Sequence, residues 1–192
     1  MKEKKQRKKL GVMIFIVVIM IGTSFSVFFF GGSPQSSVVK YQGIKFAGSN
    51  QGPWIAKING KDAAFSFLPD EVDSINISGD ISILQGKFEI DVTSDVNSTY
   101  KESIALVQHQ LGLTLANYNI YVRKGFTANN TFNIPIITCS DAVSNVPVVY
   151  FVHGNSTSII SENSCIVVKA SNDIEFIKAK DRLLYGIPGV VK

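Results

Sequence analysis

The longest apolar run of the chain comes first and contains no ionisable side chain. It covers residues 10–30 and follows a tail, residues 1–9, that carries six Lys or Arg and one acidic residue. As a helix, these residues would span roughly 31 Å, enough to cross the ~30 Å core of a bilayer. The basic flank predicts a cytoplasmic N-terminus and a remainder outside. We therefore expect a single-pass cell-membrane protein, anchored in the lipid bilayer by residues 10–30.

Two other interpretations of the N-terminal run are weaker. A cleaved signal peptide would need small residues near its end, but the run closes on Phe28, Phe29 and Phe30. Cleavage after Gly11 would release a pilin-like surface subunit, whose helix normally continues into the outer domain. Here residues 31–39 are rich in Gly and Ser, which is typical of a flexible linker. An uncleaved signal-anchor is therefore favoured.

Residues 40–192 have the pattern of an extracytoplasmic α/β domain. In residues 40–70, apolar segments at 40–47, 54–58 and 63–68 predict an antiparallel β-meander, with a tight hairpin at Asn59-Gly60. Trp54, Phe65 and Phe67 are expected on its hydrophobic face. The meander would extend the main sheet at one edge or pack as a small subdomain.

Residues 74–192 alternate between strand-like and helix-like segments. Strands are predicted at 75–78, 81–84, 87–92, 120–123, 134–139, 148–152 and 165–170. One helix should begin at the apparent capping box Thr99-x-x-Glu102 and bury Ile104, Val107 and Leu111, and another should cover residues 172–184. The apolar strands predict a mixed or largely parallel central sheet, flanked by helices and buried on both faces.

Charge argues against a nucleic-acid partner. The whole chain has a net charge of +4, but without residues 1–9 it is about −1. Nucleic-acid binding requires clustered basic residues on the folded domain. Arg123-Lys124 is the one adjacent basic pair after the anchor, and it is expected to be a solvated strand end.

Cysteine and asparagine patterns fit an exported domain. Cys139 and Cys165 are expected to form a disulfide, with two buried thiols as the alternative. They lack the close ligand pairing of a metal site, so no metal is expected. Four Asn-x-Ser/Thr sequons provide possible glycosylation sites at Asn76, Asn97, Asn129 and Asn155.

Candidate catalytic residues are few and of ordinary type. Asp95, Asp141 and His153 follow predicted strands, and His153 could act as a base if the three converge. The simpler interpretation makes the two aspartates turn or cap residues. His109 is expected on the exposed side of its helix, and Asp181 is expected to pair with Lys178 or with a neighbouring strand. The sequence has no cofactor-binding motif, so no cofactor is expected.

Seven segments together form a recognisable pattern: residues 54–60, 65–70, 97–100, 134–139, 148–151, 165–168 and 181–186. This pattern resembles a family of uncharacterised, single-span membrane proteins of small-genome archaea. It implies an archaeal cell surface and transfers no functional residue. The sequence favours a membrane-anchored binding or structural domain with a protein or envelope partner. A cell-envelope hydrolase or transferase is the main alternative.

Overall fold

The computed structural model describes residues 37–48 and 52–187. The predicted basic tail, the membrane anchor at 10–30 and most of the linker lie outside these residues. Within the described part, none of the helices combines the length and the apolar character needed to cross a membrane. The linker was expected to reach residue 39, but strand β1 (Ser37–Tyr41) already includes its last residues.

The first sheet has four antiparallel strands in the order β1-β2-β3-β4. The others are β2 (Ile44–Gly48), β3 (Trp54–Ile58) and β4 (Lys61–Phe65). The Asn59-Gly60 hairpin is confirmed, with φ values of 51° and 80°. A single strand at 40–47 was wrong, because Gln42 and Gly43 adopt φ values of 46° and 84° and form a second tight turn.

The second sheet is mixed and has six strands in the order β5-β9-β10-β8-β6-β7. Strands β10, β8, β6 and β7 are parallel, whereas β9 runs antiparallel to β10 and is parallel to β5. Their bounds are β5 (Asn76–Ser78), β6 (Glu89–Ser94), β7 (Tyr121–Phe126), β8 (Val148–His153), β9 (Ser158–Glu162) and β10 (Cys165–Ala170).

Two predicted strands of this sheet were wrong and one strand was missed. Residues 81–84 form a 3-10 helix, η1 (Ile81–Leu84), capped by Asp80. Residues 134–139 make only an isolated bridge between Ile136 and Phe126 before a 3-10 turn, η2 (Cys139–Asp141). Strand β9 was not predicted, because its polar and apolar residues do not alternate regularly.

Within the described residues, two long α-helices and one short α-helix complete the fold. Helix α3 (Lys101–Ala116) buries Ile104, Val107 and Leu111 as predicted, but Thr99 is not its cap: the cap position is Tyr100, which makes no side-chain capping bond. Helix α4 (Asp173–Gly186) does begin with the predicted cap, since the Asn172 side chain accepts a hydrogen bond from the Glu175 N–H. The short helix is α2 (Pro69–Val72).

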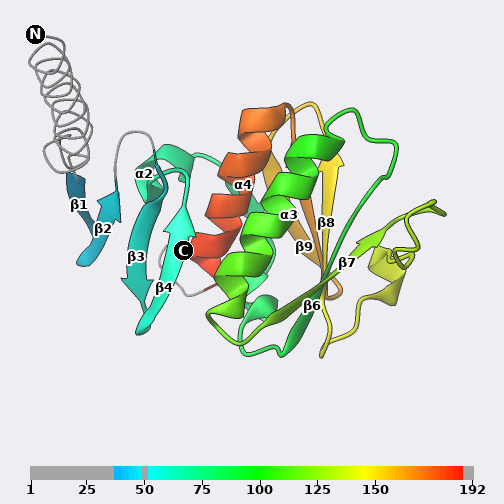
Figure 1. The fold of residues 1–192 in the computed structure, drawn as a ribbon, viewed down its shortest axis with the longest axis horizontal. Helices are drawn as coiled ribbons and strands as arrows, with labels where there is room; N and C mark the ends of the chain where they lie inside the picture. The colour runs from blue at the N-terminus through cyan, green and yellow to red at the C-terminus, as the bar shows by residue number, and fades with distance from the viewer. Residues whose placement is uncertain (1–36, 49–51, 188–192) are drawn as a thin grey trace, which may run out of the picture. The chain divides into compact units, whose positions relative to one another are not determined.

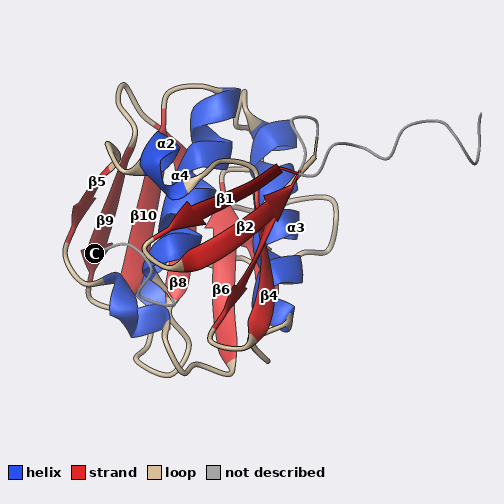
Figure 2. Ribbon diagram, turned by 90° about the vertical axis from the view of Figure 1, so that its left-hand side faces the viewer, coloured by secondary structure: helices blue, strands red, loops and turns tan. Residues whose placement is uncertain are grey.

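The helices α3 and α4 lie between the two sheets (Figures 1 and 2). The meander therefore forms a sheet of its own instead of extending the six-stranded one. Phe65 stacks on Tyr185 of α4 with ring centroids 4.1 Å apart, and Phe46 packs edge-on against both rings. One continuous hydrophobic core joins the three layers.

A buried ion pair ties helix α4 to the end of β4. Asp181 is fully buried, contacts Lys180, and accepts hydrogen bonds from the main-chain N–H groups of Ser66 and Phe67 at 2.8 and 2.9 Å. Burial raises the pKa of Asp181, against the opposing effect of Lys180. The expected pairing with Lys178 was wrong, since Lys178 pairs with Glu175. The other expectation, that Asp181 contacts a neighbouring strand, agrees better with its bonds to Ser66 and Phe67, which directly follow β4.

Candidate functional site

The six-stranded sheet is covered by helices on one face only, contrary to the expectation that both faces are buried. Val149, Phe151, Ile166 and Val168 are completely buried toward α3 and α4. Their neighbours along the same strands point the other way, because side chains alternate across a sheet. On that side, called the open face below, Val148 and Cys165 are buried, but four other apolar residues are only half-buried: Tyr150, Val152, Ile160 and Val167.

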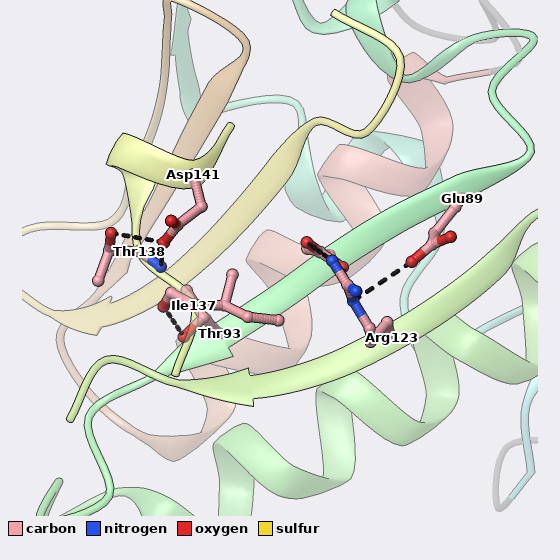
Figure 3. A network of polar contacts seen from close by, with 7 residues as sticks. Glu89, Thr93, Arg123, Ile137, Thr138 and Asp141 are labelled. Atoms are coloured by element: carbon pink, nitrogen blue, oxygen red, sulfur yellow. Dashed lines mark hydrogen bonds and ion pairs between the residues drawn. The ribbon is translucent and has the colours of Figure 1, made fainter. Parts of the chain in front are cut away.

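A loop segment, residues 134–146, partly covers the open face and is called the strap below. Its fixed point is Ile137, whose N–H donates to the Phe126 carbonyl at 2.8 Å and whose carbonyl accepts from the buried Thr93 hydroxyl at 2.7 Å (Figure 3). Gly125 lies under Ile137, and a Cβ there would come within 2.6 Å of the Ile137 side chain. The main chain of β7 must therefore carry glycine where the strap crosses it.

The predicted disulfide is confirmed and joins the strap to the sheet. Cys139 and Cys165 are bonded, with their Cα atoms 5.3 Å apart. Cys165 begins β10 and packs with Ile137 and Val148 in a small hydrophobic cluster separate from the main core. The strap is therefore held by hydrogen bonds at Ile137 and by a covalent bond two residues further on, at Cys139.

A local capping box closes the turn of the strap beside the disulfide. One carboxylate oxygen of Asp141 accepts hydrogen bonds from the Thr138 N–H at 2.8 Å and from the Thr138 hydroxyl at 2.9 Å (Figure 3). Both bonds lower the pKa of Asp141, and the bond from the main-chain N–H has the larger effect. The arrangement gives Asp141 a structural role in this turn.

A groove of about 400 Å³ opens on the open face between the strap and strand β9. Its floor is the apolar pair Ile160 and Val167, which are cross-strand partners in β9 and β10. Glu162 and Lys169 place opposite charges along its walls, and Cys139 brings the disulfide to its edge. An apolar floor with a polar rim is the arrangement found at the centre of many protein–protein interfaces.

An ion pair lies on the open face at β6 and β7. Arg123 makes two hydrogen bonds of 2.7 Å to the two carboxylate oxygens of Asp91, and its Nε also lies 3.2 Å from Glu89 (Figure 3). Asp91 is 2% exposed and Arg123 is 48% exposed. The bonds to Asp91 raise the pKa of Arg123. Arg123 is thus more than the solvated strand end expected, because the parallel register sets it opposite Asp91.

The three candidate catalytic residues occupy two different places. Asp95 follows β6 and His153 is the last residue of β8, so both lie at the same edge of the sheet. Asp95 accepts a hydrogen bond from the Asn97 N–H in a turn, and the His153 ring lies 5.0 Å from the Tyr100 ring. Asp141 belongs to the strap, which is bonded to the first residue of β10 at the opposite edge. The structure therefore brings two of the three to one edge, both of them exposed.

Other polar features serve the fold. His109 is exposed on α3, as expected. A second hollow, of about 640 Å³, lies beside the edge strand β5 and is lined by Asp73, Asp80 and Arg182. There Arg182 lies 3.8 Å from Asp73, and Asp80 accepts the Ser82 N–H at the start of η1. Among the described residues, no three His, Cys, Asp or Glu side chains are grouped to hold a metal ion.

The described residues thus define a three-layer domain in which two helices separate a small antiparallel sheet from a mixed sheet with one open face. Comparison with known proteins finds no match to this chain among family models, curated proteins or solved structures. The resemblance to archaeal single-span membrane proteins stays a prediction. Any proposal about function therefore rests on the geometry of the open face.

Proposed function

We propose that this chain is a membrane-anchored extracytoplasmic binding domain that docks a partner protein on the open face. The observation that carries the proposal is the difference between the two faces of the six-stranded sheet. The same strands are covered by α3 and α4 on one face, whereas Tyr150, Val152 and Val167 are only half-buried on the other. Surfaces of this kind, bordered by polar residues, are typical of interaction sites.

The disulfide supports the proposed location. Disulfides persist in oxidising compartments and are rare in the cytosol of most organisms. The bond between Cys139 and Cys165 therefore agrees with a domain held outside the membrane by residues 10–30.

The partner that fits this surface is a protein segment with an apolar centre and charged flanks. Ile160 and Val167 offer the apolar floor of the groove, and Glu162 and Lys169 offer one charge of each sign. Apolar contact would supply most of the affinity, while the two charges would fix the orientation of the segment.

Photo-crosslinking in intact cells tests the proposal. The crosslinking residue p-benzoylphenylalanine is placed in the full chain at Val167 or, as a matched control, at Leu113, which is apolar and 59% exposed on α3. We expect a discrete crosslinked product from Val167 alone, and we expect Ile160→Lys to abolish it. Equal products from both positions, or a product unaffected by Ile160→Lys, would contradict docking on the open face.

A further inference from the structure

The fold brings all four Asn-x-Ser/Thr sequons to a single edge of the six-stranded sheet. Asn97 follows β6, Asn129 follows β7 and Asn155 follows β8, and these three strands are parallel neighbours. Their carboxyl ends therefore meet at one edge of the sheet. The sequence spacing of the three sequons gives no sign of this, because they are far apart along the chain.

The fourth sequon reaches the same edge by another route. Asn76 begins β5 and is the register partner of Ser158, the first residue of β9. Ser158 in turn pairs with Lys169 near the end of β10, next to the pairing of Ala170 with His153. Strand β5 runs against the parallel strands, so its first residue lies where their last residues lie.

The opposite edge of the sheet also carries asparagines, but none of them is in a sequon. They lie in the segments that precede β7, β8 and β10, and they are Asn117, Asn119, Asn145 and Asn163. Asparagine therefore occurs at both edges of the sheet, whereas the sequons occur at only one of them.

All four sequon asparagines can accept a modification without disturbing the domain. Each is exposed, and among the described residues none of their side-chain amides takes part in a hydrogen bond. The hydroxyl residues of the sequons are accessible as well: Ser78, Thr99 and Thr131 are exposed and Thr157 is half-buried.

We infer that these four asparagines are N-glycosylated and form one glycan-bearing edge. In each transfer, the side-chain amide nitrogen bonds to the anomeric carbon of a lipid-phosphate-linked oligosaccharide. The bond from that carbon to the phosphate oxygen breaks, the lipid phosphate leaves with the electron pair, and the amide proton passes to a base of the membrane-bound transferase. The inference rests on the extracytoplasmic location in the proposed function.

The glycan-bearing edge complements the proposed docking surface. The groove extends along β10 from Glu162 and Cys165, at the opposite edge of the sheet, to Lys169 near the glycan-bearing edge. Carboxyl ends of parallel strands are the usual ligand-binding edge of α/β sheets. Glycans there would hinder macromolecules at Asp95 and His153 and leave the end of the groove at Glu162 and Cys165 accessible.

Cell-free translation of the full chain with glycosylation-competent microsomes tests the inference. Wild type is compared with Asn76→Gln, Asn97→Gln, Asn129→Gln and Asn155→Gln. On a gel, we expect wild type to form a ladder of four glycosidase-sensitive steps in mobility, one for each glycan. Each variant is expected to lose one of these steps. If any of the four variants leaves the ladder unchanged, the inference that all four asparagines are glycosylated is overturned.

Two controls separate this failure from failure of the proposed location. Glu162→Asn creates a sequon with Asn163 and Ser164 at the groove, and an added step shows that the transferase reaches the domain. Protease protection of residues 37–192 in the same microsomes reports the location independently of glycans. If the domain is protected from protease but only Glu162→Asn adds a glycan, the glycan inference alone is overturned. If the domain is neither protected nor glycosylated, the proposed location and the glycan inference are both overturned.

Discussion

The two faces of the six-stranded sheet are built from the same strands but are stabilised in different ways. On the helix-covered face, Phe151, Ile166 and Val168 pack into the continuous core shared with the four-stranded sheet. On the open face, Ile137, Val148 and Cys165 form a small separate cluster under the strap. Apolar composition alone therefore does not tell how many faces of a strand are covered.

The difference extends to the polar contacts. Helix α4 is joined to the chain after β4 by buried groups: the Asp181 carboxylate, its contact with Lys180, and the Tyr185 hydroxyl, which donates to the Phe67 carbonyl at 2.7 Å. The strap is held by a few separate contacts: the hydrogen bonds of Ile137, the disulfide of Cys139, and the exposed bonds between Thr138 and Asp141. We therefore expect damage on the helix side to open the whole domain at once, and damage on the strap side to open the strap before the helices.

The largest effect is expected from Asp181→Ala. This change leaves Lys180 buried without its carboxylate partner and removes the acceptor of the Ser66 and Phe67 N–H groups. Breaking one side of a buried ion pair typically costs about 3–5 kcal/mol. Urea unfolding of the full chain in detergent, followed by the fluorescence of the single Trp54, measures the loss.

A matched control for Asp181→Ala is Lys178→Ala on the same helix. Its partner Glu175 is one turn away and both side chains are partly exposed, so the expected loss is below about 1 kcal/mol. A combined Lys180→Met and Asp181→Asn variant should be more stable than Asp181→Ala, because it no longer buries an unpaired charge. Equal losses for Asp181→Ala and Lys178→Ala would contradict the role of the buried pair.

The next effect is expected from removing the disulfide with Cys139→Ser and Cys165→Ser. The bond closes a loop with a sequence separation of 26 residues, so its loss should lower the free energy of unfolding by about 3 kcal/mol. The strap should lose hydrogen-exchange protection at the Ile137 N–H before α3 and α4 lose theirs. Simultaneous loss of protection in the strap and in both helices would contradict a strap that is independent of the helix-covered face.

Local signals in the sequence predicted much of this fold correctly. The Asn59-Gly60 turn, the Asn172 cap and the apolar strands β8 and β10 each carry their own information within a few residues. The disulfide was likewise predictable, because a chain with two cysteines can form a single intramolecular pair, and this pair was expected in an oxidising compartment. These features do not depend on how distant segments pair.

Features that depend on distant pairing were not predictable. The apolar residues at 134–139 looked like a strand, but Pro135 has no N–H to donate and Ile137 packs down onto Gly125 instead of extending a ladder. Asp91 and Arg123 meet only because β6 and β7 are parallel and in that register. The open face and the shared edge of the sequons depend on strand order in the same way.

The smallest effect is expected in the capping box of the strap, at Thr138→Val. In wild type, the Thr138 N–H and hydroxyl lower the pKa of Asp141 below its ordinary value of 3.8. Val keeps the N–H and removes the hydroxyl, so the pKa of Asp141 should rise but stay below 3.8. NMR titration of the Asp141 carboxyl carbon measures the change.

The sign of the pH dependence follows from this lowered pKa. Because the folded state binds the proton less readily than the unfolded state, the charged carboxylate stabilises the strap turn above pH 3.8, and this contribution disappears as the pH falls through the folded pKa. Asp80 is a matched control, since its pKa is lowered by Ser82 and should not change in Thr138→Val. An Asp141 pKa that is identical in both proteins would show that the Thr138 hydroxyl does not hold the strap, which would leave the disulfide and the Ile137 bonds as its links to the open face.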